Sequence, residues 1–253
     1  MINTELIQQA ASLISASQQL AVLTGAGVSK ESGVPTFRDA LEGLWAQYDP
    51  KRLATRAAFE HDAKLVWDFY EFRRTLMRPA KPNPAHVSLA ALERRFPTME
   101  IITQNIDDLH EQAGSTRVIR LHGNIWANKC FFDCQGRPTR VDVSTLQWES
   151  GPPACPHCGR WVRPDVVWFG EMLPAEQLEA ASRLAVNCDV MLVVGTSGVV
   201  QPAANMPFIA KRHGAKVIEF NPVESEITPI ADVWLQAPAG ESLPHVVEAL
   251  EKA

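Results

Sequence analysis

The chain has 253 residues, of which 46% are hydrophobic and 21% charged, and this is the composition of a globular protein with a sizeable core. Its net charge of −5, with no basic run to offset it, argues against nucleic acid as the main partner. No apolar run approaches the roughly 18 residues that span a bilayer, so we expect no membrane partner.

The first predicted element is an amphipathic helix, because apolar residues recur at helical spacing between residues 6 and 14. The opening stretch lacks the basic-then-apolar order of a signal peptide. Five cysteines without an export signal favour a metal or free thiols over disulfides. We therefore expect a cytoplasmic protein, and we take a monomer as the default.

A candidate nucleotide site follows at residues 20–38, which begin with a short apolar run typical of a buried strand. Gly25 and Gly27 allow a sharp turn and let a phosphate approach bare backbone amides. Hydroxyl side chains and the cation of Arg38 come next in the same stretch. These residues predict a phosphate cradle, although Lys30 stands where the common dinucleotide fingerprint has its third glycine.

The next segment departs from a classical dinucleotide domain, which places a second, acidic-tipped strand soon after its first helix. Residues 39–84 contain no convincing strand. Residues 58–77 have the pattern of a helix instead, and Pro79, Pro82 and Pro84 end it. This pattern counts against a standard NAD-linked oxidoreductase.

From residue 86 onward the sequence alternates between helical and strand patterns. We predict helices at residues 86–96, 107–113, 176–186, 202–213 and 243–252, and strands at 100–103, 118–121, 190–194, 216–220 and 233–235. The alternation predicts an α/β fold: a Rossmann-like, doubly wound parallel sheet with a smaller inserted lobe. The expected large domain comprises residues 1–38, 85–124 and 169–253, and the expected small lobe, a helical module plus a metal module, comprises 39–84 and 125–168.

Polar residues follow five of the predicted strands. They occupy segments 24–27, 103–107, 122–123, 195–197 and 221–222. Ligands of open parallel sheets bind outside the carboxyl ends of the strands. One polar strand end would mean little, but five favour a single shared crevice.

Four of the five cysteines lie in the irregular stretch 128–164. Three residues separate Cys130 from Cys134, and two separate Cys155 from Cys158. Two close pairs of thiolates suit a tetrahedral structural zinc ion. The alternative is a set of buried free cysteines, and we expect His157, which lies between two cysteines, to be a bystander.

Several motifs occur in a fixed order along the chain: GAGVSKESGVPTFR, TQNID, LHG, the two cysteine pairs, VVWFGE, GTS and FNP. In this order they resemble the sirtuin family of NAD-dependent protein lysine deacylases. The resemblance covers nearly the whole chain. The details resemble the desuccinylase and demalonylase branch, class III, because Thr36 stands where many sirtuins have Asp and because of the helix 58–77. The family's first cysteine pair usually has a two-residue spacer, and this chain has three residues there.

The resemblance implies a reaction that consumes NAD. The acyl-lysine oxygen attacks the ribose as nicotinamide leaves, and the acyl group departs as O-acyl-ADP-ribose. Acylated proteins would be the partners. The residues expected to contact NAD are Gly25, Ala26, Gly27, Ser29, Thr36, Phe37, Arg38, Gln104, Asn105, Ile106, Asp107, Gly195, Thr196, Ser197, Asn221, Pro222, Val223 and Ala239.

Three residues would carry the chemistry on this resemblance. His122 is the expected base, because an imidazole titrates near neutral pH, although a lone histidine after a strand is more often a cap. Asn105 and Asp107 resemble the pair that grips the nicotinamide end and positions a water. Asp107 could equally cap the helix that it begins, since Asp is a favoured N-cap.

The substrate would be held in two places. The resemblance implies that the peptide adds a strand, through main-chain hydrogen bonds, beside the segment Val167, Trp168, Phe169, Gly170 and Glu171. Tyr70 and Arg73 would select the acyl group, because residues three apart share a helix face and a guanidinium pairs with a carboxylate. An ordinary surface arginine beside a packed tyrosine is the alternative for this pair.

The expected activity is removal of succinyl, malonyl and, more weakly, acetyl groups from lysine. A deacetylase-dominant sirtuin or a mono-ADP-ribosyltransferase on the same scaffold is the alternative. An NAD-linked oxidoreductase and a zinc-stapled binding module are further rivals, which the missing third glycine and the negative charge respectively oppose.

Overall fold

The computed structural model describes residues 3–35 and 49–252. The chain divides into two units, which are described separately. The first unit contains Met1–Thr36, Ala80–Leu121 and Pro174–Ala253, and the second contains Phe37–Pro79 and His122–Leu173.

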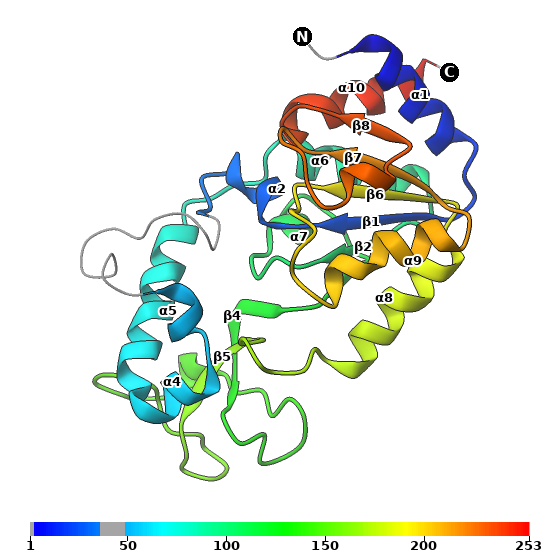
Figure 1. The fold of residues 1–253 in the computed structure, drawn as a ribbon. Helices are drawn as coiled ribbons and strands as arrows, with labels where there is room; N and C mark the ends of the chain where they lie inside the picture. Colours follow the sequence, from blue (N-terminus) through cyan, green and yellow to red (C-terminus); the bar gives the residue numbers. More distant parts are fainter. Residues whose placement is uncertain (1–2, 36–48, 253) are drawn as a thin grey trace. The chain divides into compact units, whose positions relative to one another are not determined.

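A six-stranded sheet forms the centre of the first unit (Figure 1). Its strands are β1 (Leu20–Thr24), β2 (Glu100–Thr103), β3 (Val118–Arg120), β6 (Val190–Val194), β7 (Lys216–Phe220) and β8 (Val233–Leu235). They lie in the order β3-β2-β1-β6-β7-β8, and every neighbouring pair is parallel. The predicted Rossmann-like parallel sheet is therefore confirmed.

Helices cover both faces of this sheet (Figure 1). One group contains α1 (Thr4–Ser15), α6 (Pro84–Arg95) and α10 (Ala239–Glu251), and the other contains α8 (Ala175–Asn187) and α9 (Met206–Arg212). Shorter elements are α2 (Ala26–Lys30), α7 (Leu109–Gln112), η3 (Ala203–Asn205) and η4 (Thr228–Ile230). None of the described helices has both the length and the apolar character needed to cross a membrane.

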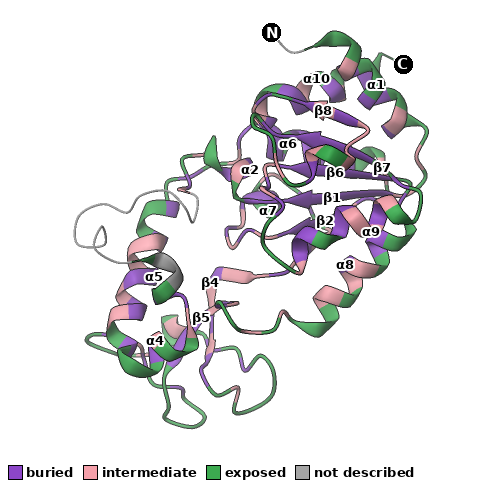
Figure 2. Cartoon of the chain, viewed as in Figure 1, coloured by how far each residue is buried: buried purple, intermediate pink, exposed green. Residues whose placement is uncertain are grey.

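The core of the first unit explains why its central strands read as unbroken apolar runs. Every residue of β1 and β6 is buried, as Figure 2 shows in purple. Strands covered by helices on both faces lose the alternation of polar and apolar residues. Ile14 of α1, Leu89 of α6 and Leu243 of α10 close one side of this core.

The second unit combines helices with a two-stranded sheet. Its helices are α3 (Pro50–Leu53), α4 (Arg56–His61) and α5 (Ala63–Met77), with one turn of 3-10 helix, η2 (Val143–Thr145). Strands β4 (Gly123–Cys130) and β5 (Val162–Val166) pair antiparallel, with a register shift between Asn124 and Asn128. Aromatic rings pack together in this unit, since Phe59 of α4 contacts Phe131, which follows β4, and Trp168, which follows β5, at centroid distances of 5.1 and 5.3 Å.

Several element boundaries differ from the prediction. The helix expected at 58–77 is two helices, because Asp62 leaves the helical conformation and its Oδ1 accepts from Leu65 N at 2.9 Å, which begins a new helix. The helix expected at 202–213 begins as the 3-10 turn η3. Helix α7 begins at Leu109, two residues later than expected. Strands β4 and β5 were not predicted, because each lies partly in the stretch 128–164, whose sequence has no regular pattern.

Candidate functional site

The first unit contains a topological switch point beside its central strand. Strand β1 has β2 on one side and β6 on the other, and the sheet order runs outward from it in both directions. In such sheets a ligand binds in the crevice outside the carboxyl ends of the strands at this point. The polar segments predicted after β1, β2, β6 and β7 follow those carboxyl ends, whereas the fifth segment, which contains His122, belongs to the second unit.

Three glycines bring the turns after β1 and β6 together. Gly25 N donates to Val194 O at 3.0 Å, and Gly27 N donates to Gly195 O at 2.8 Å. A Cβ on Gly27 would lie 2.6 Å from Gly195 O, and one on Gly25 would lie 2.7 Å from Thr196 Cβ. A side chain at either position would push the two turns apart. The glycines predicted to admit a phosphate therefore also let two backbones pack closely.

A buried network joins the turn after β1 to the turn after β2. Asn105 Nδ2 donates to Gly25 O and to Ser29 Oγ, each at 3.1 Å. Ser29 Oγ donates to Asp107 Oδ2 at 2.9 Å. Ser29, Asn105 and Asp107 are 1%, 6% and 6% exposed. The pair predicted to grip the nicotinamide end is thus brought together by the hydroxyl of the glycine loop.

Asp107 precedes Asp108, the N-cap of α7, and it contacts both the start of this helix and the glycine loop. Its Oδ1 accepts from Leu109 N at 3.1 Å, at the entry to α7, while Oδ2 faces Ser29. Burial raises the pKa of the Asp107 carboxyl above its usual range, and the Leu109 amide, the Ser29 hydroxyl and Arg120 oppose that rise. A buried carboxyl with a raised pKa is common at functional sites.

A second network lies at the ends of β6 and β7. Gln104 Nε2 donates to Thr196 Oγ1 at 3.0 Å, and Asn221 Nδ2 donates to Thr196 O at 2.8 Å. Below them Glu219 is 0% exposed and accepts from the hydroxyls of Ser225 and Thr228 at 2.5 and 2.6 Å, and from Asn221 Nδ2 at 3.3 Å. The fully buried carboxylate therefore fixes the orientation of Asn221.

The remaining expected NAD contacts of the first unit differ in exposure. Ala26, Pro222 and Val223 are exposed, Ile106 and Ser197 are intermediate, and Ala239 is buried as the first residue of α10. Next to it Gly240 N donates to Glu31 Oε2 at 2.8 Å, which ties the start of α10 to the end of the glycine loop. Thr36, Phe37 and Arg38 lie outside the described residues.

Two buried histidines lie under the end of β1. His110 Nε2 is 3.0 Å from Thr24 Oγ1, and the His110 and His86 ring centroids are 5.0 Å apart. Burial lowers the pKa of His86 to about 4. Burial, together with His86 and Arg120, lowers the pKa of His110 to about 3. Both imidazoles are therefore neutral at physiological pH. They pack beneath Thr24, the residue that precedes the glycine loop.

In the second unit, His122 is directly tied to the predicted peptide segment. His122 O accepts from Val167 N at 3.0 Å, and Phe169 N donates to Ala54 O at 2.9 Å. The next residue, Gly123, has a φ of +79°, and a Cβ there would collide with Asp165 O. The glycine of the LHG motif thus lets the backbone after His122 pass against β5. A backbone hydrogen bond consequently joins His122, the expected base, to the segment 167–171 that is expected to pair with the peptide.

Tyr70 and Arg73 lie on α5, as the sequence predicted. Tyr70 is 2% exposed, and its hydroxyl accepts from Trp168 Nε1 at 3.0 Å. Arg73 Cζ lies 5.8 Å from the ring centroids of both Phe69 and Tyr70. Burial lowers the pKa of Arg73, and burial raises the pKa of Tyr70. A cation and a protonated phenol therefore share an aromatic environment.

The neighbouring Arg74 has a structural role. Its Nε donates to Ile125 O at 2.7 Å, and its Nη2 donates to Asn128 Oδ1 at 2.7 Å. Its Nη1 donates to Glu71 Oε1 at 2.6 Å. These bonds attach α5 to β4.

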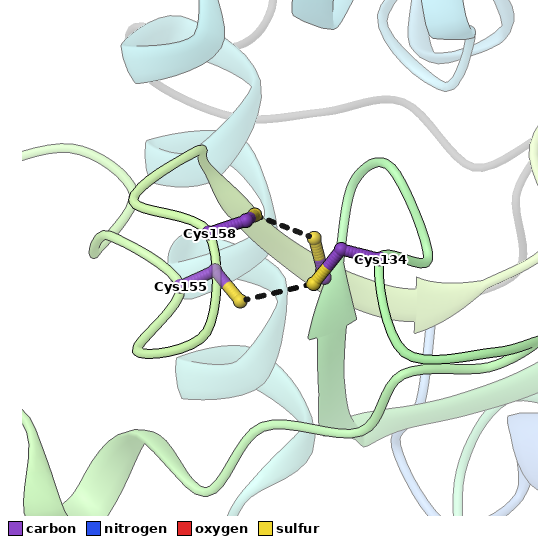
Figure 3. A group of neighbouring side chains, drawn as sticks. Cys134, Cys155 and Cys158 are labelled. Atoms are coloured by element: carbon purple, nitrogen blue, oxygen red, sulfur yellow. Dashed lines mark hydrogen bonds between the residues drawn. The ribbon is translucent and has the colours of Figure 1, made fainter.

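The four predicted metal ligands come together in the second unit (Figure 3). The Sγ atoms of Cys130, Cys134, Cys155 and Cys158 all lie within 4.8 Å of one another. Cys130 Sγ is 3.6 Å from Cys158 Sγ, and Cys134 Sγ is 3.8 Å from Cys155 Sγ. Tetrahedral zinc with Zn–S bonds of about 2.3 Å needs sulfur atoms about 3.8 Å apart. The group therefore fits zinc, and these separations are too long for disulfide bonds.

The three-residue spacer in the first cysteine pair is accommodated by one unusual residue. Asp133, immediately before Cys134, has a φ of +48°, in the left-handed region. Burial alone would raise the pKa of the Cys130 thiol, but the backbone N–H groups of Cys134 and Phe132 bring it below its ordinary value. Donors of this kind favour a thiolate, which is the form that binds zinc. His157 is exposed and is not part of the group.

Two buried charges near the expected ligand residues were not singled out from the sequence. Glu219 lies within the apolar run of β7, and Arg163 within β5. Each is at most 1% exposed, and each is hydrogen-bonded to several partners. A charged residue inside a strand pattern was the available signal, because a buried charge must be paired.

This chain is similar to known proteins over most of its length. The family model described as "Sir2 family" matches residues 25–202. A protein of Ralstonia nicotianae named NAD-dependent protein deacylase is 51% identical over 239 residues, which cover 94% of this chain and 95% of that protein. A protein of Pyrococcus furiosus with the same name is 48% identical over 249 residues, which cover 98% and 99%.

Solved structures are similar over the same length. A Sir2 homologue in complex with NAD superposes with a TM-score of 0.88 and 44% identity, covering 97% of this chain and 94% of the other. The structure of Sir2Af2 bound to a myristoylated histone peptide has a TM-score of 0.78 and 36% identity, covering 99% and 98%.

Proposed function

This chain belongs to the Sir2 family, the sirtuins, and we propose that it is an NAD-dependent protein deacylase that prefers succinyl- and malonyl-lysine and removes acetyl groups more weakly. Two relatives named NAD-dependent protein deacylase are about half identical to this chain over nearly their full length, which supports the general activity. The observation that carries the acyl preference is the pair Tyr70 and Arg73 on α5. Nicotinamide, the freed lysine and O-acyl-ADP-ribose would be the products.

The first unit would bind NAD. Gly25 and Gly27 carry no side chains that would keep the phosphates away from the loop, and Ser29 and Thr196 would add hydroxyls. The Asn105–Ser29–Asp107 network would hold the nicotinamide end, because its amide and carboxyl are fixed by hydrogen bonds before the ligand arrives. Gln104, Asn221 and Ala239, with the residues beside them, would line the remaining half of the dinucleotide.

The second unit would bring the acylated protein. His122 would accept a proton from a ribose hydroxyl, since an unperturbed imidazole titrates at about 6.5 and suits a base near neutral pH. The segment Val167–Trp168–Phe169–Gly170–Glu171 would pair with the peptide through main-chain groups. Such pairing reads little of the peptide sequence, so many acylated proteins would be accepted.

We also propose that the two units correspond to the NAD-binding domain and to a small lobe with a helical and a zinc module. Zinc held by Cys130, Cys134, Cys155 and Cys158 would be structural. All four expected ligands are cysteines, so the ion would keep no open position for substrate. Its contribution would be to fix the loops that flank β4 and β5.

The acyl preference follows from electrostatics. A guanidinium near two aromatic rings is poorly solvated, so it gains more from an anionic partner than an exposed arginine would. A succinyl or malonyl group ends in a carboxylate and would supply that charge. An acetyl group would leave the cation without an anion from the substrate, so binding would be weaker.

The test compares kcat/KM for matched succinyl-, malonyl- and acetyl-lysine peptides with NAD. Removing a hydrogen bond to a charged group costs about 1.5–3 kcal/mol, so Arg73→Met should lower the succinyl-to-acetyl ratio about 10- to 150-fold. Arg73→Lys is the matched control, because it retains the charge but cannot form the two parallel hydrogen bonds of a guanidinium. Its succinyl-to-acetyl ratio should lie between those of the wild type and Arg73→Met. A wild-type preference for acetyl, or a ratio unchanged in Arg73→Met, would overturn the acyl assignment.

The general activity is tested in the same assay. His122→Tyr should abolish release of nicotinamide and O-acyl-ADP-ribose while the circular dichroism spectrum of the folded chain is retained. Deacylation that persists in this variant would contradict the role of His122. Radiolabel from the adenylate half of NAD that stays on protein would instead indicate ADP-ribosyl transfer.

A further inference from the structure

The indole of Trp168 is held by an ion pair whose arginine is buried. Arg163 and Trp168 are each 1% exposed, and Arg163 Cζ lies 3.2 Å from the centroid of the indole. Arg163 Nη1 and Nη2 donate to Glu171 Oε1 and Oε2 at 2.5 and 3.0 Å. The same guanidinium donates to Val166 O at 2.6 Å. This forked geometry fixes the plane on which the indole rests.

Glu171 also holds the backbone of Trp168. Its Oε2 accepts from Trp168 N at 2.9 Å, and its own N donates to Trp168 O at 3.0 Å. The indole also packs against the Phe59 ring at a centroid distance of 5.3 Å and an interplanar angle of 44°. Both the backbone and the ring of Trp168 are therefore restrained. The one polar atom of the indole, Nε1, is directed at Tyr70 Oη, 3.0 Å away.

This contact decides what Tyr70 can offer to a ligand. An indole N–H is only a donor, so the phenol oxygen must be the acceptor. The O–H bond of a phenol stays near the plane of the ring and has two in-plane positions. Arg73 is a second hydrogen-bond partner of this hydroxyl, and its guanidinium, which has no acceptor, also donates to the oxygen. The two donors together leave the hydroxyl proton one direction, and loss of the indole donor would allow it to turn. Tyr70 thereby becomes a donor of fixed direction, and a carboxylate is the acceptor that profits most from it.

We propose that Trp168 is a positioning residue for acyl selection, because its indole N–H fixes the direction in which the Tyr70 hydroxyl donates to the acyl carboxylate. This inference rests on the proposed function. Arg163 strengthens the arrangement, since a cation over the indole face withdraws electron density and makes Nε1–H a better donor. The Arg163 cation thus polarises the indole N–H, which in turn polarises the Tyr70 hydroxyl that is expected to face the acyl group.

The chosen test variant is Trp168→Phe, which keeps an aromatic ring and removes only the indole N–H and the second ring. The readout is the ratio of kcat/KM for succinyl-lysine to that for acetyl-lysine on one preparation, so loss of folded protein or weaker peptide binding cancels. A neutral hydrogen bond is at stake, so the ratio should fall about three- to tenfold.

A double-mutant cycle separates positioning from packing. In the Tyr70→Phe background, Trp168→Phe should no longer change the ratio, because the hydroxyl that it orients is gone. The matched control is Trp161→Phe, because Trp161 also contacts the Phe59 ring, at 5.9 Å, and should leave the ratio as in the wild type. An effect of Trp168→Phe that is equal in both backgrounds would indicate packing alone and would overturn the inference.

The outcomes distinguish this inference from the proposal on which it rests. If Arg73→Met and Tyr70→Phe leave the ratio unchanged, the acyl preference itself is wrong. If both lower the ratio and Trp168→Phe does not, the acyl preference stands and the positioning role of Trp168 is refuted.

Discussion

Replacing Gly195 by alanine should damage the first unit more than a glycine-to-alanine change usually does. Gly195 has a φ of +61°, in the left-handed region that favours glycine. A Cβ there would overlap Val28 N and approach Gly27 C to 2.6 Å. Both atoms belong to backbone, which cannot move aside as a flexible side chain can. The same approach carries the bond from Gly27 N to Gly195 O at 2.8 Å.

The expected cost has two parts. Alanine in a left-handed conformation costs about 1–2 kcal/mol. Forcing a methyl group into a packed site adds about 1–3 kcal/mol. The free energy of unfolding should therefore fall by about 2–5 kcal/mol. Urea unfolding followed by circular dichroism measures this loss, because most of the described helical residues belong to the first unit.

The matched control is Gly214→Ala. Gly214 has a φ of +95°, and nothing lies within 4 Å of a Cβ built on it. It should therefore lose only the conformational part, about 1–2 kcal/mol. Separating the turns after β1 and β6 should also raise the KM for NAD in Gly195→Ala by about tenfold or more, and Gly214→Ala should not change it. Equal stability losses with an unchanged KM for NAD would refute the packing argument.

Two further predictions concern the metal and the pH. Removing zinc with a chelator at neutral pH should lower the melting temperature and the deacylase activity together. Both should return when zinc is restored. Deacylase activity that survives full removal of zinc would contradict a structural role for the ion. Between the ordinary histidine pKa of about 6.5 and the folded value of about 3 for His110, only the unfolded chain binds this proton, so stability should fall as the pH drops below about 6.5. The loss from His110 at pH 5 should be about 2 kcal/mol, and in urea titrations His110→Gln should lose less between pH 7 and pH 5 than the wild type does.

The sequence predicted the sheet of the first unit well for a physical reason. Strands β1 and β6 are buried on both faces, so their apolar runs are unbroken and easy to recognise. Strand β4, GNIWANKC, contains two asparagines and a lysine, and β5 contains Pro164. Neither strand has the alternation of apolar and polar residues that indicates a strand. Cross-strand pairing and the cysteine group stabilise them, and no local sequence pattern encodes these interactions.

The same distinction applies to the candidate site. Asn105 and Asp107 were predicted from strand-end position and Ser29 from its place in the glycine loop, but the hydrogen bonds that join them link residues 76 to 78 positions apart. Local pattern predicts which strand ends are polar, whereas strand order decides which of them meet. The order β2-β1-β6 puts the turns after these strands next to one another, and strand order is a property of the whole fold.

Each unit contains a fully buried charged residue, Glu219 or Arg163, beside the residues that are expected to bind ligand. Glu219 orients Asn221 in the first unit, and Arg163 fixes Trp168 in the second. Burying a charge is costly, and a neutral core of equal volume is often as stable. A charge with several fixed partners has few alternative arrangements, so the polar group that it holds keeps one direction in the absence of ligand. The cost in stability would thus be offset by preorganisation at the two places where we propose that this chain binds its ligands.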